Sequence, residues 1–362
     1  MYRNEKLREK LACGIRVRWF HRWWEPHKTT GETLDRRFFC VEQDLILKFF
    51  KDLGPFEAVM EATATYEWLW ELLEPMAQRL LLAHPKKIRI IAESMKKTDK
   101  HDAYFLAWLL SIDSIPEAHR PTPRQREYQH LVKHRSNFVS SRSRLMTQVR
   151  SILAAKNLDY QGLFTRDGRA ALSKLNFSSA EKYRLDELLK AFDSVDEQIK
   201  RATKQLAEFR KGSSESEKKL HSIVTSVPGV GDLIEDIVLS TLGDVTRFPN
   251  AQKCTAYAGV VPGFRESDNK RRELGITKEG PRMFRWALVQ AAWRATQFSD
   301  YWKDEFEKIA ARRGKRKAVV AIARRLLAVI YSLIKKGEPY KEKLRFPTLP
   351  PKRPKGKMKF GA

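Results

Sequence analysis

Two long tracts in the middle of the chain constrain its fold more than any other feature. Residues 124–154 contain neither Gly nor Pro, and apolar side chains such as Leu131 and Phe138 recur on one helical face. Residues 179–211 carry apolar side chains in a near-heptad rhythm, which is typical of helices that pack along their length. The pair predicts a helical coiled-coil arm of antiparallel helices over residues 121–211. A plain helical hairpin within a larger bundle explains the same pattern equally well.

Residues 1–118 have the pattern of an α/β domain. Short apolar strands alternate with amphipathic helices, the strands at residues 31–39, 56–61 and 79–85 and the helices at residues 42–53 and 66–73. Such alternation packs helices against a layer of strands. Residues 1–30 mix Trp and Arg side chains without alternation or helical period, and we expect them to be irregular.

Three acids stand where this domain is expected to bind a ligand. Asp99 and Asp102 lie in the first turn of a predicted helix, with Thr98 as its N-cap. Glu61 ends a predicted strand, and α/β folds place ligands at the carboxyl ends of strands. Capping and the helix dipole alone also favour Asp in a first turn. As a set, the three carboxylates are suited to Mg²⁺, which phosphoryl-transfer sites hold with carboxylates and phosphate oxygens.

Residues 217–338 predict an all-α domain. ProGlyValGly at residues 228–231 joins two helical patterns as a helix-hairpin-helix element does, and Gly229 and Gly231 allow the backbone to approach a phosphate. A tight turn between helices without any ligand explains the same residues. Further helices are predicted at residues 251–259, 285–295, 301–311 and 318–334. Residues 341–362 are rich in Pro and Lys and predict a basic disordered tail.

The charge of the chain points to a polyanionic partner. Its 362 residues include 70 Lys and Arg against 44 Asp and Glu, a net charge of +26. No run of about 18 apolar residues is present, and the N-terminus lacks the apolar core of a signal peptide, so we expect no membrane association and a cytoplasmic location. Cys13, Cys40 and Cys254 are too few and too scattered to predict a disulfide framework or a zinc site.

Two parts of the chain resemble a known family. VMEATATYEWLWELLEP, LLLAHPKKIRIIAE and KKTDKHDAYFLAWLL occur in this order and resemble the RuvC-like (RNase H-like) N-terminal domain of the insertion-sequence 110/116/902 transposases, which include the Piv DNA invertase. Residues 260–286 resemble the C-terminal transposase domain of the same family. The resemblance covers residues 31–336. It implies a bacterial DNA transposase or recombinase, associated with the nucleoid when bound to DNA.

The resemblance also assigns roles to residues. It implies that Mg²⁺ binds to Glu61, Asp99 and Asp102, and that Ser267 joins transiently to DNA as a nucleophile. Ser267 stands in a predicted loop, before cations of the kind that stabilise charge on an attacked phosphorus and before a helix that Pro281 can start. Asp268 follows it, where the family more often has a small residue. The residues expected to bind nucleic acid are Gly229, Gly231, Lys270, Arg271, Arg272, Lys278 and Arg282.

Assembly and guidance are implied by the resemblance alone. Members of the family are expected to form homodimers or homotetramers. A structured noncoding RNA from the element is expected to guide the choice of DNA site.

One departure from the family concerns the first metal ligand. The family has an aspartate in a GlyIleAsp sequence at the start of the first strand, whereas Gly14 and Ile15 are followed here by Arg16. A true substitution, or a frameshift or wrong start affecting residues 1–30, explains this difference. Alternatively, Glu32 or Asp35 completes the site. Because a guanidinium repels Mg²⁺, we expect this copy to bind the metal poorly.

Two other functions remain open from the sequence. A RuvC-like junction nuclease would use the acids alone and leave Ser267 without a role. A non-catalytic relic would still bind DNA or RNA through its basic residues.

Overall fold

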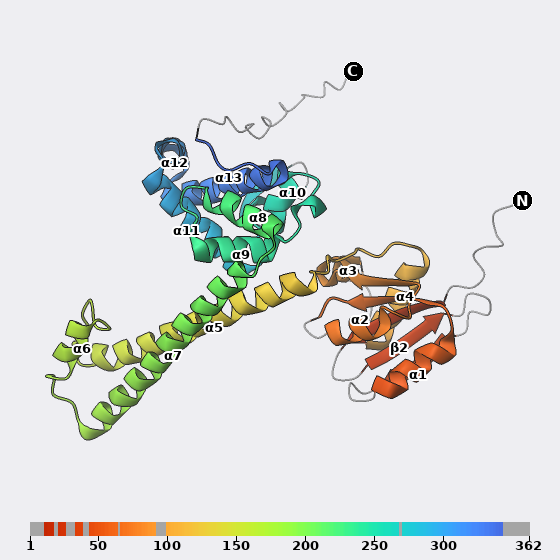
Figure 1. Cartoon of the computed structure of the whole chain (residues 1–362), viewed down its shortest axis with the longest axis horizontal. Coiled ribbons are helices and arrows are strands. Elements are labelled where there is room, and N and C mark those ends of the chain that lie inside the picture. The colour runs from red at the N-terminus through yellow and green to blue at the C-terminus, as the bar shows by residue number, and fades with distance from the viewer. Residues whose placement is uncertain are drawn as a thin grey trace, which may run out of the picture. The chain divides into compact units, whose positions relative to one another are not determined.

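The computed structural model divides into two compact units, residues 1–120 and 121–362, and each is described by itself (Figure 1). The structure describes residues 11–17, 21–26, 33–38, 43–63, 66–91, 99–267 and 270–342. Of the described residues up to 38, from 89 to 104 and from 264 to 273, it gives the backbone alone. The predicted tail lies outside the described residues from position 343 onward.

Unit 1 is built on a mixed five-stranded sheet of order β3-β2-β1-β4-β5. Its strands are β1 (Leu11–Val17), β2 (His21–Pro26), β3 (Thr33–Phe38), β4 (Phe56–Glu61) and β5 (Arg79–Ala83). Its helices are α1 (Gln43–Leu53), α2 (Glu67–Leu73), α3 (Pro85–Ile91) and α4 (Asp99–Ser111). Pairing is antiparallel from β3 to β1 and parallel from β1 to β5. The strands and helices predicted from residue 31 to residue 83 are therefore confirmed.

Strand β4 is the centre of this unit because both of its faces are covered. Phe56, Ala58 and Met60 are fully buried in one cluster with side chains of α1 and α2. Val59 points to the other face, where it is buried with Leu106 and Leu110 of α4. A strand that is covered on both sides is expected to be apolar at consecutive positions, and residues 56–60 are apolar except for the buried Glu57.

The expectation that residues 1–30 are irregular is wrong. Strand β1 pairs in parallel with β4 and antiparallel with β2, so this stretch supplies two strands of the sheet. Its mixed composition hides them because β1 is an inner strand, for which a simple polar-apolar alternation is not required.

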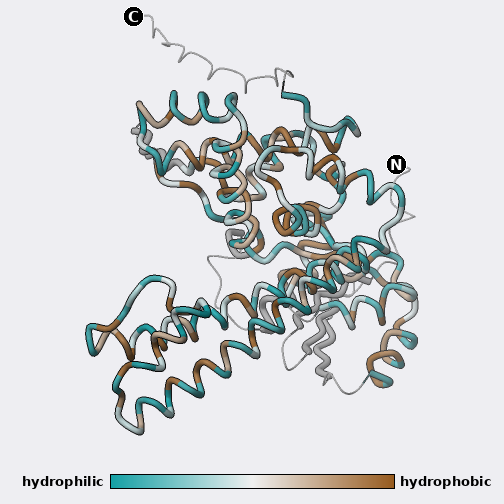
Figure 2. Tube along the Cα trace, turned by 60° about the vertical axis from the view of Figure 1, so that its left-hand side comes forward, coloured by the Kyte–Doolittle hydropathy of each residue, from teal (hydrophilic) through white to brown (hydrophobic). Residues whose placement is uncertain are grey.

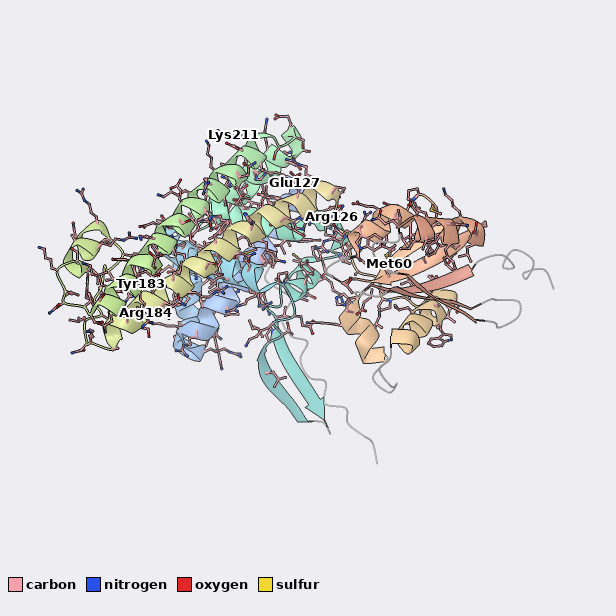
Figure 3. The ribbon with its side chains drawn as sticks, turned by 90° about the horizontal axis from the view of Figure 1, so that it is seen from below. Met60, Arg126, Glu127, Tyr183, Arg184 and Lys211 are labelled. Carbon is pink, nitrogen blue, oxygen red and sulfur yellow. The ribbon has the colours of Figure 1, made fainter. Side chains whose placement is uncertain are left out.

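Unit 2 begins with a long helical hairpin, which we call the arm. It consists of α5 (Pro123–Ala154), α6 (Arg166–Leu172) and α7 (Ser179–Lys211). Side-chain contacts join Arg135 of α5 to Thr203 of α7 and Arg142 of α5 to Asp196 of α7, an order that requires antiparallel helices. Figure 3 shows the same arrangement, with Lys211 at the end of the arm where Arg126 lies. The two predicted helices are confirmed.

The packing of the arm follows its heptad pattern. Leu185, Phe192, Ile199 and Leu206 of α7 stand seven residues apart, and all are at most 8% exposed. Figure 2 shows apolar residues recurring along both helices, with hydrophilic residues between them. Caps fix the helix ends: Thr122 accepts from the N–H of Gln125, and Ser178 forms a capping box with Glu181. The backbone N–H of Ser178 and the ammonium of Lys156 hold the pKa of Glu181 at about 2.

The rest of unit 2 is a helical core around α13. Its elements are α8 (Glu215–Thr225), α9 (Asp232–Leu242), the short helix η1 (Val245–Arg247), α10 (Ala251–Tyr257), α11 (Arg282–Phe298), α12 (Asp300–Arg313) and α13 (Lys315–Lys336). The inner face of α11 is mostly alanine, which lets neighbouring backbones approach closely, and Ala287, Ala291 and Ala295 are fully buried. None of the helices in the described part of the chain has the length and hydrophobicity needed to cross a lipid bilayer.

The expected all-α character of this domain is wrong in one place. Strands β6 (Pro262–Ser267) and β7 (Lys270–Ile276) form an antiparallel ribbon. Figure 3 shows the ribbon extending away from the helices of unit 2. Only two residues, Asp268 and Asn269, separate the strands in the sequence, and two-residue loops are the commonest hairpin connections. A two-stranded ribbon needs no apolar face, so its charged strands lack the alternation by which strands are usually found.

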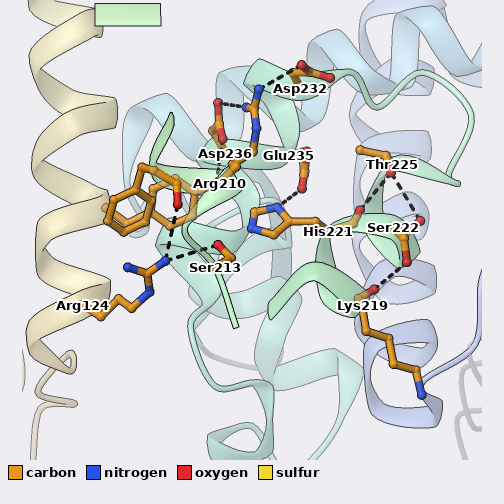
Figure 4. A network of polar contacts seen from close by, with 12 residues as sticks. Arg124, Arg210, Ser213, Lys219, His221, Ser222, Thr225, Asp232, Glu235 and Asp236 are labelled. Carbon is orange, nitrogen blue, oxygen red and sulfur yellow. Dashed lines mark hydrogen bonds and ion pairs between the residues drawn. The ribbon is translucent and has the colours of Figure 1, made fainter. Parts of the chain in front are cut away.

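A buried charge network joins the base of the arm to α9. The guanidinium of Arg210 lies 2.6 Å from a carboxylate oxygen of Asp236 and 2.9 Å from one of Asp232 (Figure 4). The hydroxyl of Tyr128 donates to the other oxygen of Asp236 at 2.6 Å. Burial and the neighbouring Asp236 raise the pKa of Tyr128, so this hydroxyl stays protonated. Arg210 and Tyr128 come from the two arm helices, so one carboxylate contacts both.

A paired substitution tests this joint. Asp236→Ala removes the carboxylate that both Arg210 and Tyr128 contact. We expect it to lower the free energy of unfolding by about 3 kcal/mol. The Asp236 side chain is 3% exposed, whereas that of Asp232 is 78% exposed. Asp232→Ala should therefore cost less than about 1 kcal/mol. Urea unfolding followed by circular dichroism measures both, and equal losses would contradict the assignment.

Candidate functional site

The register of the parallel strands brings three sequence positions to one edge of the unit 1 sheet. Ile15 of β1 pairs with Met60 of β4, so Arg16 and Glu61 occupy the next positions on adjacent strands. Glu61 in turn pairs with Ala83 of β5, which His84 follows. Because these strands are parallel, their carboxyl ends meet at this edge, where open α/β sheets bind ligands. The Glu61 side chain is half-buried.

Arg16 therefore lies near the carboxyl end of β1. The expectation that Gly14, Ile15 and Arg16 stand at the start of the first strand is corrected by the bounds of β1, Leu11–Val17. Position 16 is therefore close to Glu61 along the sheet, whereas a residue at the start of β1 would lie at the opposite edge.

Asp99 and Asp102 occupy the first turn of α4, as the sequence predicts. Helix α4 packs against β1, β2 and β4. The side chains of both acids lie outside what the structure describes, as does Thr98. Among the side chains that are described, no group of three His, Cys, Asp or Glu forms a metal-binding cluster.

Two polar residues at this edge were not singled out from the sequence. Thr63 follows β4 and His84 follows β5, and within the described residues the Oγ1 of Thr63 and the Nδ1 of His84 are buried without a hydrogen-bond partner. Most buried polar atoms are paired in native proteins, so such atoms mark a place where a polar ligand or water is expected. Glu61 is predicted as an acid at the carboxyl end of a strand, and the same position, extended to uncharged polar residues just past the strand, would have indicated Thr63 and His84.

The candidate nucleophile Ser267 ends β6, so its predicted place in a loop is wrong. It pairs directly with Lys270 of β7, and Arg265 pairs with Arg272. Alternate residues of a strand share a face, and so do directly opposed residues. Positions 265, 267, 270 and 272 therefore lie on one face of the ribbon, while position 271 lies on the other. The strand register thus groups the serine position with three cationic positions.

Lys278 lies between the ribbon and α11, and Arg282 lies at the start of α11. Lys278 is exposed and adopts a left-handed backbone conformation with φ 57°, and its N–H donates to the carbonyl of Gly259. Arg282 is exposed and is the first residue of α11, the helix that Pro281 was predicted to start. Both cations remain available to a polyanion at the base of the ribbon.

The ProGlyValGly turn joins α8 to α9, and its two glycines differ in role. Gly229 has a φ of +82°, and a Cβ there would lie 2.4 Å from the carbonyl oxygen of Ala291 in α11. Packing against α11 therefore explains this glycine without a phosphate. Gly231 is the N-cap of α9, and a Cβ there would meet nothing within 4 Å.

Comparison with known proteins identifies the family of the chain. Residues 29–157 match the family model described as Transposase for the DEDD-type domain of IS110 elements, and residues 221–307 match the model of the IS116/IS110/IS902 transposase family. Together the two models span more than half of the chain.

Individual relatives extend the match over most of the sequence. The chain is 27% identical to the transposase for insertion sequence element IS1111A of Coxiella burnetii, over 78% of this chain and 79% of that protein. It is 24% identical to a probable family 20 transposase of Pseudomonas aeruginosa, over 81% of this chain and 88% of that one. It is also 24% identical to the pilin gene-inverting protein of Moraxella bovis, over 79% and 82% of the two chains.

These matches show that the chain is a DNA transposase or recombinase. The chain belongs to the IS116/IS110/IS902 family of insertion-sequence transposases.

Two glycine substitutions test the roles assigned to the α8–α9 turn. Gly229→Ala forces a side chain into the backbone of α11 and strains a positive φ, and we expect a loss of more than about 2 kcal/mol in unfolding free energy. Gly231→Ala adds a Cβ that meets nothing within 4 Å, so it should change the free energy of unfolding by less than about 1 kcal/mol. Thermal unfolding compares them, and a tolerated Gly229→Ala would remove the packing explanation.

Proposed function

We propose that the chain cuts and rejoins DNA with a metal site in unit 1 and a serine nucleophile in unit 2. The mixed sheet of unit 1, with helices packed on both faces, supports a RuvC-like (RNase H-like) fold. Membership in the transposase family supports DNA as the substrate. The net charge of +26 supports a polyanionic partner as well.

The observation that carries the metal site is the register of β1 and β4. Position 16, where the resemblance puts the family's first aspartate, follows Ile15, which pairs with Met60, so this register supports a shared site with Glu61. The unpaired Thr63 and His84 atoms at the same edge support a polar ligand there. Glu61, Asp99 and Asp102 supply the carboxylate oxygens that Mg²⁺ prefers, so these residues fit the ion. Arg16 does not fit it.

Bound Mg²⁺ would supply charge neutralisation at the attacked phosphate and its leaving oxygen. The three carboxylates would hold the ion and orient the phosphodiester against the sheet edge. The half-buried setting of Glu61 limits water around its carboxylate, which strengthens its attraction to a cation.

Ser267 would perform the covalent step. Its hydroxyl loses a proton to solvent as its oxygen bonds to phosphorus, and the bond from phosphorus to one bridging oxygen of the strand breaks. The departing strand end takes up a proton as a hydroxyl, and reversal with another strand end rejoins the DNA. The cationic positions 265, 270 and 272 on the same ribbon face support this role, because negative charge builds on the phosphate.

Recognition and assembly complete the proposal. The exposed Lys278 and Arg282, with Lys270, Arg271 and Arg272 on the ribbon, would contact phosphates. The turn at Gly231 has open space beside it and begins a helix, so it would also accept a phosphate. By family resemblance, the chain would act as a homodimer or homotetramer whose site is chosen by a noncoding RNA.

A second candidate, a nucleic-acid-binding relic without cleavage activity, is favoured by one observation. Arg16 brings a cation to the position beside Glu61 where a metal ligand belongs. Such a relic keeps its basic surfaces and loses only the metal site. A junction nuclease that uses the acids alone has no comparable support, because it leaves the ribbon's register unexplained.

Removing the serine hydroxyl separates these functions. In a chain that recombines DNA, Ser267→Ala should abolish strand exchange and the covalent protein-DNA adduct, because no other oxygen at that position can attack phosphorus. Ser240→Ala, which alters a buried serine in α9, is the control for a lost hydroxyl. Denaturing gels detect the adduct. Strand exchange at the parent rate in Ser267→Ala would indicate the nuclease.

Restoring an acid at position 16 tests the metal site. We expect Arg16→Asp to tighten Mg²⁺ binding by roughly tenfold or more, because a repulsive charge becomes an attractive one. Arg144→Asp makes the same charge change at an exposed arm residue and should leave Mg²⁺ affinity unchanged. Calorimetric titration and a DNA cleavage assay measure the effect. Efficient Mg²⁺-dependent cleavage by the unaltered chain would refute it.

A further inference from the structure

Exposed aromatic side chains gather in one part of unit 2. Six of the large hydrophobic side chains that are exposed in the described structure lie between residues 257 and 301: Tyr257, Leu274, Trp286, Trp293, Phe298 and Tyr301. Helix α11 alone carries three of them, and Trp286 is 49% and Phe298 69% exposed. Tryptophan is normally well buried, so two exposed Trp on one helix point to a binding surface.

The two tryptophans share a face of α11. Trp286 and Trp293 stand seven residues apart, which is two helical turns and about 10.5 Å along the axis. Trp293 is braced by the ring of Phe306, whose centroid lies 5.4 Å away. The opposite face of the helix is the buried alanine row that packs into the core. The aromatic face is therefore held on a rigid element.

The charge of α11 is uniformly positive. From residue 282 to residue 298 there is no Asp or Glu, while Arg282, Arg285 and Arg294 are present. Arg282 and Arg294 are exposed, and the guanidinium of Arg294 lies 5.4 Å from the ring centroid of Phe298. An apolar face for a protein partner needs no such bias, whereas a nucleic-acid strand matches aromatic rings with its bases and arginines with its phosphates.

Paired and unpaired bases differ in whether their faces are free to stack on these rings. In a duplex each base face is covered by its neighbours, so only unpaired or splayed bases can stack on Trp286 and Trp293. The axial separation of the rings equals about three base steps of 3.4 Å in a stacked strand. A second copy of this chain is a poorer occupant, because two surfaces of the same positive sign repel.

We propose that the outward face of α11, carrying Arg282, Trp286, Trp293 and Arg294, binds unpaired nucleotides of DNA or RNA by stacking. The proposal rests on the proposed function only in that the chain acts on nucleic acid. It assigns to this helix a single-strand site next to the ribbon in sequence, distinct from the contacts of Ser267.

Binding of single strands by the full chain tests the proposal. Fluorescence anisotropy in EDTA compares unstructured oligo-dT and oligo-U of about 20 nucleotides with a duplex of the same length. Trp286→Ala and Trp293→Ala should each weaken single-strand binding by roughly 5- to 100-fold, with duplex affinity unchanged. Trp286→Phe, which retains a ring, should restore most of the affinity. Whichever oligonucleotide binds more tightly identifies the strand as DNA or RNA.

Salt dependence separates stacking from charge. The Trp substitutions remove no charge, so the slope of log affinity against log salt should stay at the parent value. Arg282→Gln should reduce that slope by about one phosphate contact. Tyr183→Ala is the matched control, since Tyr183 is 68% exposed and lies on the arm beside Lys182 and Arg184, with acids nearby. It should leave binding unchanged.

Three results would overturn the proposal. The first is single-strand affinity at the parent level in both Trp variants. The second is an equal loss of single-strand and duplex binding, which would indicate a general structural effect. The third is a shift from oligomer to monomer in sedimentation of Trp286→Ala with nucleic-acid binding intact, which would make α11 an interface between copies. Because EDTA excludes metal-dependent cleavage, none of these results depends on the chemistry of Ser267 or the acids.

Discussion

The parallel pairing of β1 with β4 is the constraint on which the candidate metal site depends. Both strands are inner strands, and β4 is buried on its two faces by α1, α2 and α4. A slip of one residue would move every side chain of β4 to the wrong face, so burial enforces the register. That register aligns Arg16 with Glu61. The identity of the residue at position 16 therefore sets the charge at the sheet edge.

The two faces of helix α11 in unit 2 have different roles. The inner face of α11 is mostly alanine, which allows Gly229 of the α8–α9 turn to approach the backbone at Ala291 and Ala295. Its outer face carries the exposed Trp286 and the partly exposed Trp293, whose ring contacts Phe306 of α12. Small residues on the inside let the helix sit deep in the core, so large aromatic residues on the outside are held without being buried. Rigidity of this kind favours binding because little side-chain entropy is lost.

Strong periodicity made much of this fold predictable. The heptad spacing of Leu185, Phe192 and Ile199 predicts α7, and the largely apolar run from Phe56 predicts β4. The ribbon and the first two strands were missed because their charged residues show no alternation, and their pairing depends on partners far along the chain. The packing role of Gly229 depends on α11, some 60 residues away, and local sequence carries no trace of it. The acids at Glu61, Asp99 and Asp102 were found by position, while Thr63 and His84 emerged only from burial.

The separation of cores decides what a defect at Arg16 can affect. Each unit buries its own hydrophobic clusters, and the ribbon, the α8–α9 turn and α11 all belong to unit 2. A cation at position 16 changes the charge at the carboxyl edge of the unit 1 sheet, beside Glu61. The residues proposed for metal binding and those proposed for nucleic-acid binding therefore belong to different cores, so loss of the first set is compatible with folding of the second.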